Sequence, residues 1–153
     1  IEDIYQLRRA LEPEMAADLA GRLNEDDLAG LEDIMAAYAT PAETPEEERA
    51  QHVASLQFHA RLAELSGNRL LGLIVGFITA ALSDLTVYRQ LYDPPNRTLW
   101  ERGRAFQAEL IAAFRARDPE AARRIMAAHM HTAESLMTEQ QAHVLRRFMR
   151  PSP

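Results

Sequence analysis

Apolar residues recur every three or four positions along almost the whole chain of 153 residues, which is the spacing of one face of a helix. The alternation of apolar and polar residues that marks a half-buried strand is absent. The chain also contains neither the Asn-Gly nor the Asp-Gly pair that is typical of a tight hairpin. These patterns predict an all-α fold.

Capping and helix-breaking residues divide the chain into six predicted helices. Asn24, followed by acidic residues, is a typical helix start, and so is Thr44 with Pro45 at the first helical position. Asp118 precedes Pro119 in a third start of this kind, whereas the stretch "YDPPN" must end a helix because proline lacks the backbone donor. Short connections between long helices favour an antiparallel six-helix bundle. The predicted helices span 2–23, 25–38, 45–65, 69–91, 98–117 and 119–147, and the tail "RPSP" is expected to fray.

The predicted fourth helix is apolar on nearly all sides as far as Ala81, so we expect it at the centre of the bundle or at a subunit interface. Its longest apolar run, "LLGLIVGFITAAL", has 13 residues, which is shorter than the roughly 20 residues of a membrane span. The first residues are already amphipathic helix and have no signal-peptide pattern. We therefore expect a cytoplasmic protein without a membrane partner.

The charge of the chain argues against direct binding to nucleic acid. The net charge is −6, and the arginines are scattered among acidic residues instead of forming a basic stripe. Cysteine is absent, which excludes disulfides and thiolate metal sites. The sequence begins inside an amphipathic helix, which suggests a domain taken from a longer protein.

Polar side chains lie at the centres of four inward helix faces. They are Arg8 with Glu12, Ser55 with His59, Gln107, and His129. Burial of a polar group without a partner costs roughly 1–3 kcal/mol, so convergence on one polar cavity is the simplest explanation. Each group also has a structural explanation, because Arg8 and Glu12 can pair one turn apart, a lone histidine can bond a carbonyl, and Gln107 can bridge two helices.

Three stretches resemble the effector-binding FCD domain of GntR-type transcription regulators of the FadR subfamily: "LRRALEPEMAADLA", "FHARLAELSGN" and "RARDPEAARRIMAAHM". They occur in the order and at the separations typical of the family, from about Tyr5 to Leu136, and six helices match its VanR-like variant. The resemblance implies an FCD domain over residues 1–150, usually dimeric. It also implies a preceding winged-helix DNA-binding domain, which is absent from this sequence.

The resemblance further implies a ligand site. Many members hold a divalent metal, often zinc or nickel, through one aspartate and three histidines, and the metal and an arginine receive the carboxylate of a small organic acid. His59 and His129 match two of these histidines and Arg8 matches the arginine, whereas Ser55 replaces the aspartate and Gln107 the remaining histidine. All five are therefore predicted ligand-binding residues. His59 and His129 would hold a divalent metal weakly, or the pocket is free of metal.

We therefore expect a sensor domain, not an enzyme, that binds a small organic acid, forms a homodimer and acts on DNA through an attached domain. A dimerisation module that has lost ligand binding is an alternative. The other histidines, His52, His131 and His143, are expected on the surface or in loops.

A helical-bundle metal enzyme is the least favoured alternative. A di-iron carboxylate protein needs paired Glu-x-x-His motifs, but Glu48 and His52 are four positions apart, as are Glu139 and His143. A metal hydrolase needs a general base near its bound water. Glu12 is the only inward acidic residue that could serve, and its neighbouring arginine would neutralise it.

Overall fold

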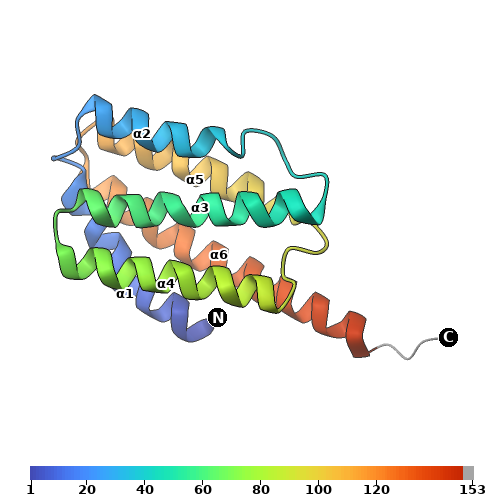
Figure 1. The fold of residues 1–153 in the computed structure, drawn as a ribbon. Helices are drawn as coiled ribbons and strands as arrows, with labels where there is room; N and C mark the ends of the chain where they lie inside the picture. The colour runs from blue at the N-terminus through green and yellow to red at the C-terminus, as the bar shows by residue number, and fades with distance from the viewer. Residues whose placement is uncertain (150–153) are drawn as a thin grey trace.

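The computed structural model describes residues 1–149, apart from the side chain of Phe148, so the predicted frayed tail lies outside the described residues. Six α-helices and no strand occur in this part of the chain, which confirms the predicted all-α fold. Figure 1 shows them as an antiparallel bundle. The helices are α1 (Glu2–Leu19), α2 (Glu25–Ala36), α3 (Pro45–Leu65), α4 (Arg69–Tyr88), α5 (Arg97–Arg115) and α6 (Pro119–Met149).

The helix starts are capped as the sequence predicts. The side chain of Asn24 accepts the backbone N–H of Asp27 at 2.9 Å, and the Asp27 carboxylate accepts that of Asn24 at 3.1 Å. Thr44 accepts a backbone N–H of α3 at 3.2 Å, and Asp118 accepts one of α6 at 2.9 Å. These bonds satisfy donors that a helix end would otherwise leave free.

Four helices, α1, α2, α4 and α5, end before their predicted limits. The chain leaves the helical conformation after Leu19 in α1 and after Tyr88 in α4, and α2 and α5 also stop early. Leu23, Tyr38 and Leu91, which lie just beyond the ends of α1, α2 and α4, are nevertheless buried against the core. Their burial continues the apolar spacing of the helix into the following turn, and this is why periodicity alone overestimates the helix length.

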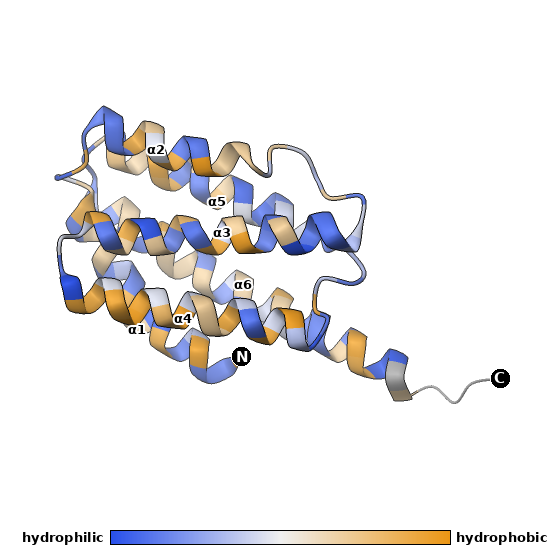
Figure 2. Cartoon of the chain, in the orientation of Figure 1, coloured by the Kyte–Doolittle hydropathy of each residue, from blue (hydrophilic) through white to orange (hydrophobic). Residues whose placement is uncertain are grey.

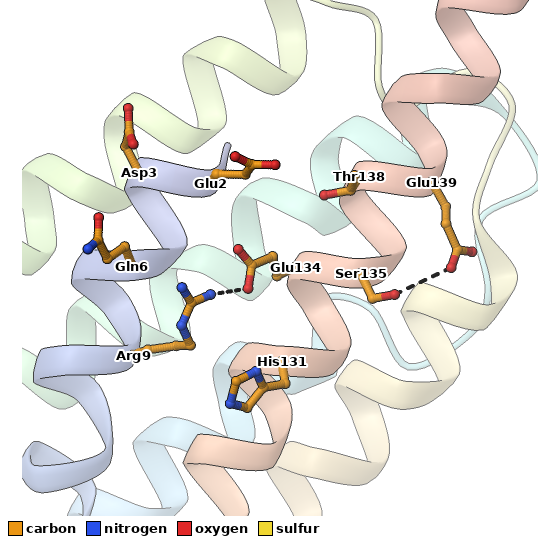
Figure 3. Close-up of a pocket in the computed structure, with 9 residues that line it drawn as sticks. All are labelled: Glu2, Asp3, Gln6, Arg9, His131, Glu134, Ser135, Thr138 and Glu139. Atoms are coloured by element: carbon orange, nitrogen blue, oxygen red, sulfur yellow. Dashed lines mark hydrogen bonds and ion pairs between the residues drawn. The ribbon is translucent and has the colours of Figure 1, made fainter.

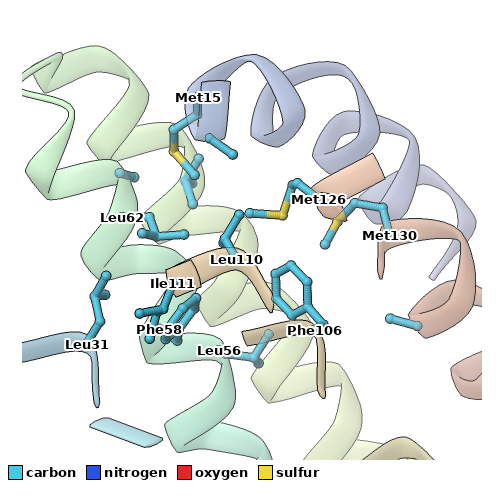
Figure 4. Packing of buried hydrophobic residues seen from close by; sticks show 14 of the residues in the cluster. Met15, Leu31, Leu56, Phe58, Leu62, Phe106, Leu110, Ile111, Met126 and Met130 are labelled. Carbon is cyan, nitrogen blue, oxygen red and sulfur yellow. The ribbon is translucent and has the colours of Figure 1, made fainter. Parts of the chain in front are cut away.

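The core lies where α1, α3, α5 and α6 meet. The helices pack as neighbours in the pairs α1 with α6, α5 with α6, α3 with α4, and α2 with α3. Met15, Leu62, Leu110 and Met126, one from each of the four helices, are at most 2% exposed and are seen together in Figure 4. Burial of such a side chain contributes roughly 1.5–3 kcal/mol.

Helix α4 lies at the edge of the bundle, not at its centre. Val75 and Leu82 face the core, whereas Leu70, Leu73 and Phe77 are 65, 70 and 73% exposed. In Figure 2 the N-terminal half of α4 is mostly hydrophobic. By length and composition alone, α4 is also apolar enough to cross a membrane, although its longest apolar run is short. One such helix is weak evidence for a membrane protein, and an exposed apolar face of this kind also fits a subunit interface.

Candidate ligand-binding site

Glu12 joins two of the predicted site residues. Arg8 and Glu12 lie on α1 and His59 lies on α3, and each is at most 2% exposed. Arg8 Nε donates to Glu12 Oε1 at 2.6 Å, and His59 Nδ1 lies 2.6 Å from Glu12 Oε2. Both carboxylate oxygens therefore have a partner, and the Arg8 guanidinium is already paired within the chain.

The charges of this group cancel. Burial would raise the pKa of Glu12, but Arg8 and His59 beside it hold that pKa well below its usual range. Burial lowers the pKa of His59 more strongly than Glu12 raises it, so the imidazole is neutral at pH 7. A neutral His59 must carry its proton on Nδ1 to donate to the carboxylate, and Nε2 therefore keeps its lone pair.

His129 lies near His59 but has a different environment. The two imidazole rings are 5.4 Å apart between centroids, with their planes 12° apart. Phe106 stacks against His129 at 3.7 Å and 4°, and its centroid is 5.7 Å from that of His59. His129 is half-buried and also lines a surface groove of about 190 Å³ between α5 and α6.

Gln107 has an internal partner as well. The hydroxyl of Tyr38, just after α2, donates to Gln107 Oε1 at 2.6 Å, and both residues are buried. Burial raises the pKa of Tyr38 to about 12, so this hydroxyl keeps its proton. The amide oxygen of Gln107, which stands at a predicted ligand position, is therefore occupied.

Ser55 opens onto a cavity between α3 and α5. The cavity measures about 50 Å³, several times the roughly 10–15 Å³ that one water needs. Arg104 lies at this cavity, with its guanidinium 5.8 Å from the centre of the Tyr38 ring and Nη1 donating to the carbonyl of Met35 at 2.8 Å. The remaining lining residues are Glu48, Gln51, His52, Leu99, Trp100 and Gly103.

The structure thus distributes the five predicted residues over four environments. Arg8 and His59 share Glu12, Gln107 pairs with Tyr38, and Ser55 and His129 open onto different spaces. Arg8, His59 and Gln107 are buried, as the helical pattern predicts, and each of them has a hydrogen-bond partner within the chain. The cavity beside Ser55, between α3 and α5, is lined by polar side chains that include Glu48, Gln51 and Arg104.

The donor set does not fit the metal centre that the resemblance implies. Among residues 1–149, no group of three His, Asp, Glu or Cys side chains is placed to hold a metal ion. Ser55 is a poor zinc ligand, Gln107 Oε1 accepts from Tyr38, and Glu12 is held by Arg8 and His59. His59 and His129 are the two remaining imidazole donors.

The prediction for His52 was wrong. Its ring is partly buried on α3, and Nε2 lies 3.1 Å from the hydroxyl of Thr86 on α4. Glu48, one turn earlier, is 8% exposed. Glu48, His52, Ser55 and His59 follow one another at spacings of four, three and four, which places them on one helix face. From this spacing the sequence could have predicted that His52 lies on the same helix face as Ser55 and His59. His131 and His143 are exposed, as predicted.

A second, wider groove lies between the start of α1 and α6 and contains none of the predicted ligand residues. It measures about 610 Å³, and Figure 3 shows the ion pair of Arg9 with Glu134 and the hydrogen bond of Ser135 with Glu139. His131 lies exposed at its edge. Most of the charged side chains in this groove are acidic, and its one arginine, Arg9, is already paired with Glu134.

Six antiparallel helices around inward polar side chains define an all-α helical bundle. The sequence matches the FCD domain family over residues 3–132, and the chain belongs to that family. It is thus a regulatory domain of the GntR type. Among solved structures it is similar to Streptococcus agalactiae GntR, with 25% sequence identity and a TM-score of 0.66. That match covers 87% of this chain and 57% of the other. No curated protein matches it.

Proposed function

We propose that this domain senses a small organic acid for a GntR-type transcription regulator, and that the acid binds in the cavity beside Ser55. The observation that carries the proposal is the cavity itself. It lies between α3 and α5, it includes the residue that stands at the family's first metal-ligand position, and it contains an arginine and two aromatic rings. Such a mixture of apolar surface with a few polar groups is typical of ligand sites.

Arg104 is the proposed anchor for the carboxylate. Arg8, the anchor expected from the sequence, is already paired in charge with Glu12 and does not line the cavity. Arg104 makes one hydrogen bond among the described residues, through Nη1, and a guanidinium has five N–H donors. A carboxylate can therefore bind Arg104 without breaking an existing ion pair. The other predicted ligand residues, Arg8, His59, Gln107 and His129, do not line this cavity.

We also propose that ligand binding does not require a metal. Two histidines without a carboxylate give a divalent ion little compensation for its charge, so zinc or nickel at His59 and His129 would be weakly held. The variant Ser55→Asp with Gln107→His restores the full family ligand set. We expect EDTA to leave the melting temperature of the natural chain unchanged, and zinc to raise it strongly in the double variant only.

The proposed function is tested by thermal unfolding with a panel of small mono- and dicarboxylic acids. An acid at 100 times its Kd adds about 2.7 kcal/mol to the free energy of unfolding. We expect Arg104→Gln to abolish this stabilisation, whereas Arg102→Gln, on the same helix but outside the cavity, should retain it. If no acid stabilises the natural chain, the domain is a dimerisation module instead.

The partners follow from the same proposal. We propose a cytoplasmic homodimer that reaches DNA through a separate N-terminal domain. The chain spans 57% of the length of the similar GntR structure, which leaves room for such a domain in the whole protein. The net charge of −6 supports a role other than direct DNA contact for this domain. The exposed apolar face of α4 supports dimerisation.

A further inference from the structure

The cavity beside Ser55 is lined on its α3 side by hydrogen-bond acceptors. Glu48 contributes its carboxylate, and it forms no ion pair with any residue in the described range 1–149. Its Oε1 accepts the backbone N–H of Asn96 at 3.2 Å, while Oε2 has no bond to another described residue. A carboxylate that is 8% exposed and lacks a cationic partner favours a positively charged ligand.

Gln51 adds a second acceptor. Its Nε2 donates to the carbonyl of Thr40 at 2.8 Å, and this bond fixes the orientation of the amide. Gln51 Oε1 is then buried without a hydrogen-bond partner among the described residues, the only buried side-chain polar atom there of which this is true. An orphaned buried acceptor costs free energy unless a donor reaches it, and a ligand in the cavity can supply that donor.

His52 adds a third acceptor because of its tautomer. The hydroxyl of Thr86 donates its single proton to the carbonyl of Leu82 at 2.8 Å. His52 Nε2, 3.1 Å from the same hydroxyl, must therefore be the donor of that contact, which leaves a lone pair on Nδ1. Burial lowers the pKa of His52 to about 4, so the ring stays neutral and keeps this acceptor at pH 7.

We propose that the ligand of this cavity carries a protonated amine, which Glu48 and Gln51 bind together with the lone pair of His52. The inference rests on the proposed ligand site and specifies its chemistry. An effector whose carboxylate meets Arg104 and whose ammonium meets Glu48 belongs to the amino-acid class. The rings of Tyr38 and Trp100 suit a cation as well, because aromatic faces attract positive charge.

The same acceptors are a poor metal site. Glu48 and His52 are the only acidic or histidine side chains that line the cavity, and no cluster of three such groups exists among the described residues. A divalent ion would lack ligands. An ammonium group, with three N–H donors, matches three acceptors on one wall.

Trp100 provides the measurement, since it lines the cavity and is the single tryptophan of the chain. The whole chain is titrated with methylammonium chloride and, separately, with sodium formate and zinc chloride at constant ionic strength, and Trp100 fluorescence is recorded. We expect a saturable change with methylammonium, with a Kd on the order of 10 mM because so small a ligand gains little binding energy. Glu48→Gln should weaken methylammonium binding at least tenfold and leave any response to formate in place.

Glu46→Gln is the matched control, because Glu46 is exposed on the same helix turn and should not change the response. Gln51→Met removes the orphaned acceptor at similar volume and should also weaken methylammonium binding, which guards against misfolding of the Glu48 variant. A response to zinc alone, or equal methylammonium binding by Glu48→Gln, overturns the inference. A response to formate without one to methylammonium also overturns it, yet leaves the proposed acid sensor intact.

Discussion

Glu12 and His59 share a 2.6 Å hydrogen bond although they are 47 positions apart, and this bond ties α1 to α3 inside the bundle. The same carboxylate also holds Arg8 at 2.6 Å. The predicted anion anchor of the site is therefore part of the folded core. The group therefore contributes to stability, and our proposal assigns ligand recognition to the cavity beside Ser55 instead.

Replacing Glu12 by Ala should cause a large loss of stability. The change leaves the Arg8 guanidinium buried without a partner, and breaking a buried pair in this way costs about 3–5 kcal/mol. Urea unfolding followed by circular dichroism measures the loss. Glu14→Ala, on the same helix as Glu12, removes an exposed ion pair with Arg123 of α6 and should change stability little. A small effect of Glu12→Ala would mean that water reaches Arg8.

Tyr38→Phe should destabilise the chain by about 1–3 kcal/mol, because it leaves the buried oxygen of Gln107 without a donor. Tyr88→Phe is the control, since Tyr88 is 87% exposed. Thermal and chemical unfolding of the two variants are compared with the natural chain. Equal stability of both variants would show that Gln107 finds another donor.

Gly103→Ala should stabilise the fold and weaken ligand binding. Gly103 is inside α5 and lines the cavity, and an added Cβ there meets no atom within 4 Å. Alanine in a helix interior is more stable than glycine by about 0.5–1 kcal/mol. Gly30→Ala in α2, where the space is also open, should give a similar gain without any change in the Trp100 response. If both variants bind equally well, the cavity does not hold the ligand.

The pH dependence of stability should contain a contribution from His52. Its pKa is about 4 in the folded chain and about 6.5 in the unfolded chain. Between these values the unfolded state binds the additional proton, so stability is full above pH 6.5 and falls as the pH drops towards 4. His52 is only partly buried, so we expect a loss of about 1–2 kcal/mol, less than the shift alone implies.

This contribution is isolated by comparing urea unfolding of the natural chain and of His52→Gln from pH 7 to pH 4. The variant should lose less stability on acidification, while His143→Gln, at an exposed position, should follow the natural chain. Parallel curves for the natural chain and His52→Gln would place the acid sensitivity in other groups.

Phe77→Glu should convert a dimer to a monomer, because it places a charge in the middle of the exposed apolar face of α4. Light scattering coupled to gel filtration measures the mass. Ala108→Glu, at an exposed position of α5, should leave the mass unchanged. A natural chain that is monomeric at every concentration would contradict dimerisation through this face.

The sequence by itself determined the six helices, their caps and the inward direction of Arg8, Ser55, His59 and Gln107. These features are local, since helical period and capping depend on residues within a few positions of one another. The resemblance to the FCD domain likewise rests on short stretches that the family match confirms.

Only the tertiary structure decided which of these polar groups became partners. Glu12 meets His59, and Tyr38 meets Gln107, across distances of 47 and 69 positions in the chain. The sequence also gave no means to see that Arg104 and Glu48 line one cavity. Hydrogen bonds are short-ranged and directional, so small differences in helix packing choose among several possible partners. A helical pattern shows which side chains face the interior, but the packing determines which of them remain free to bind a ligand.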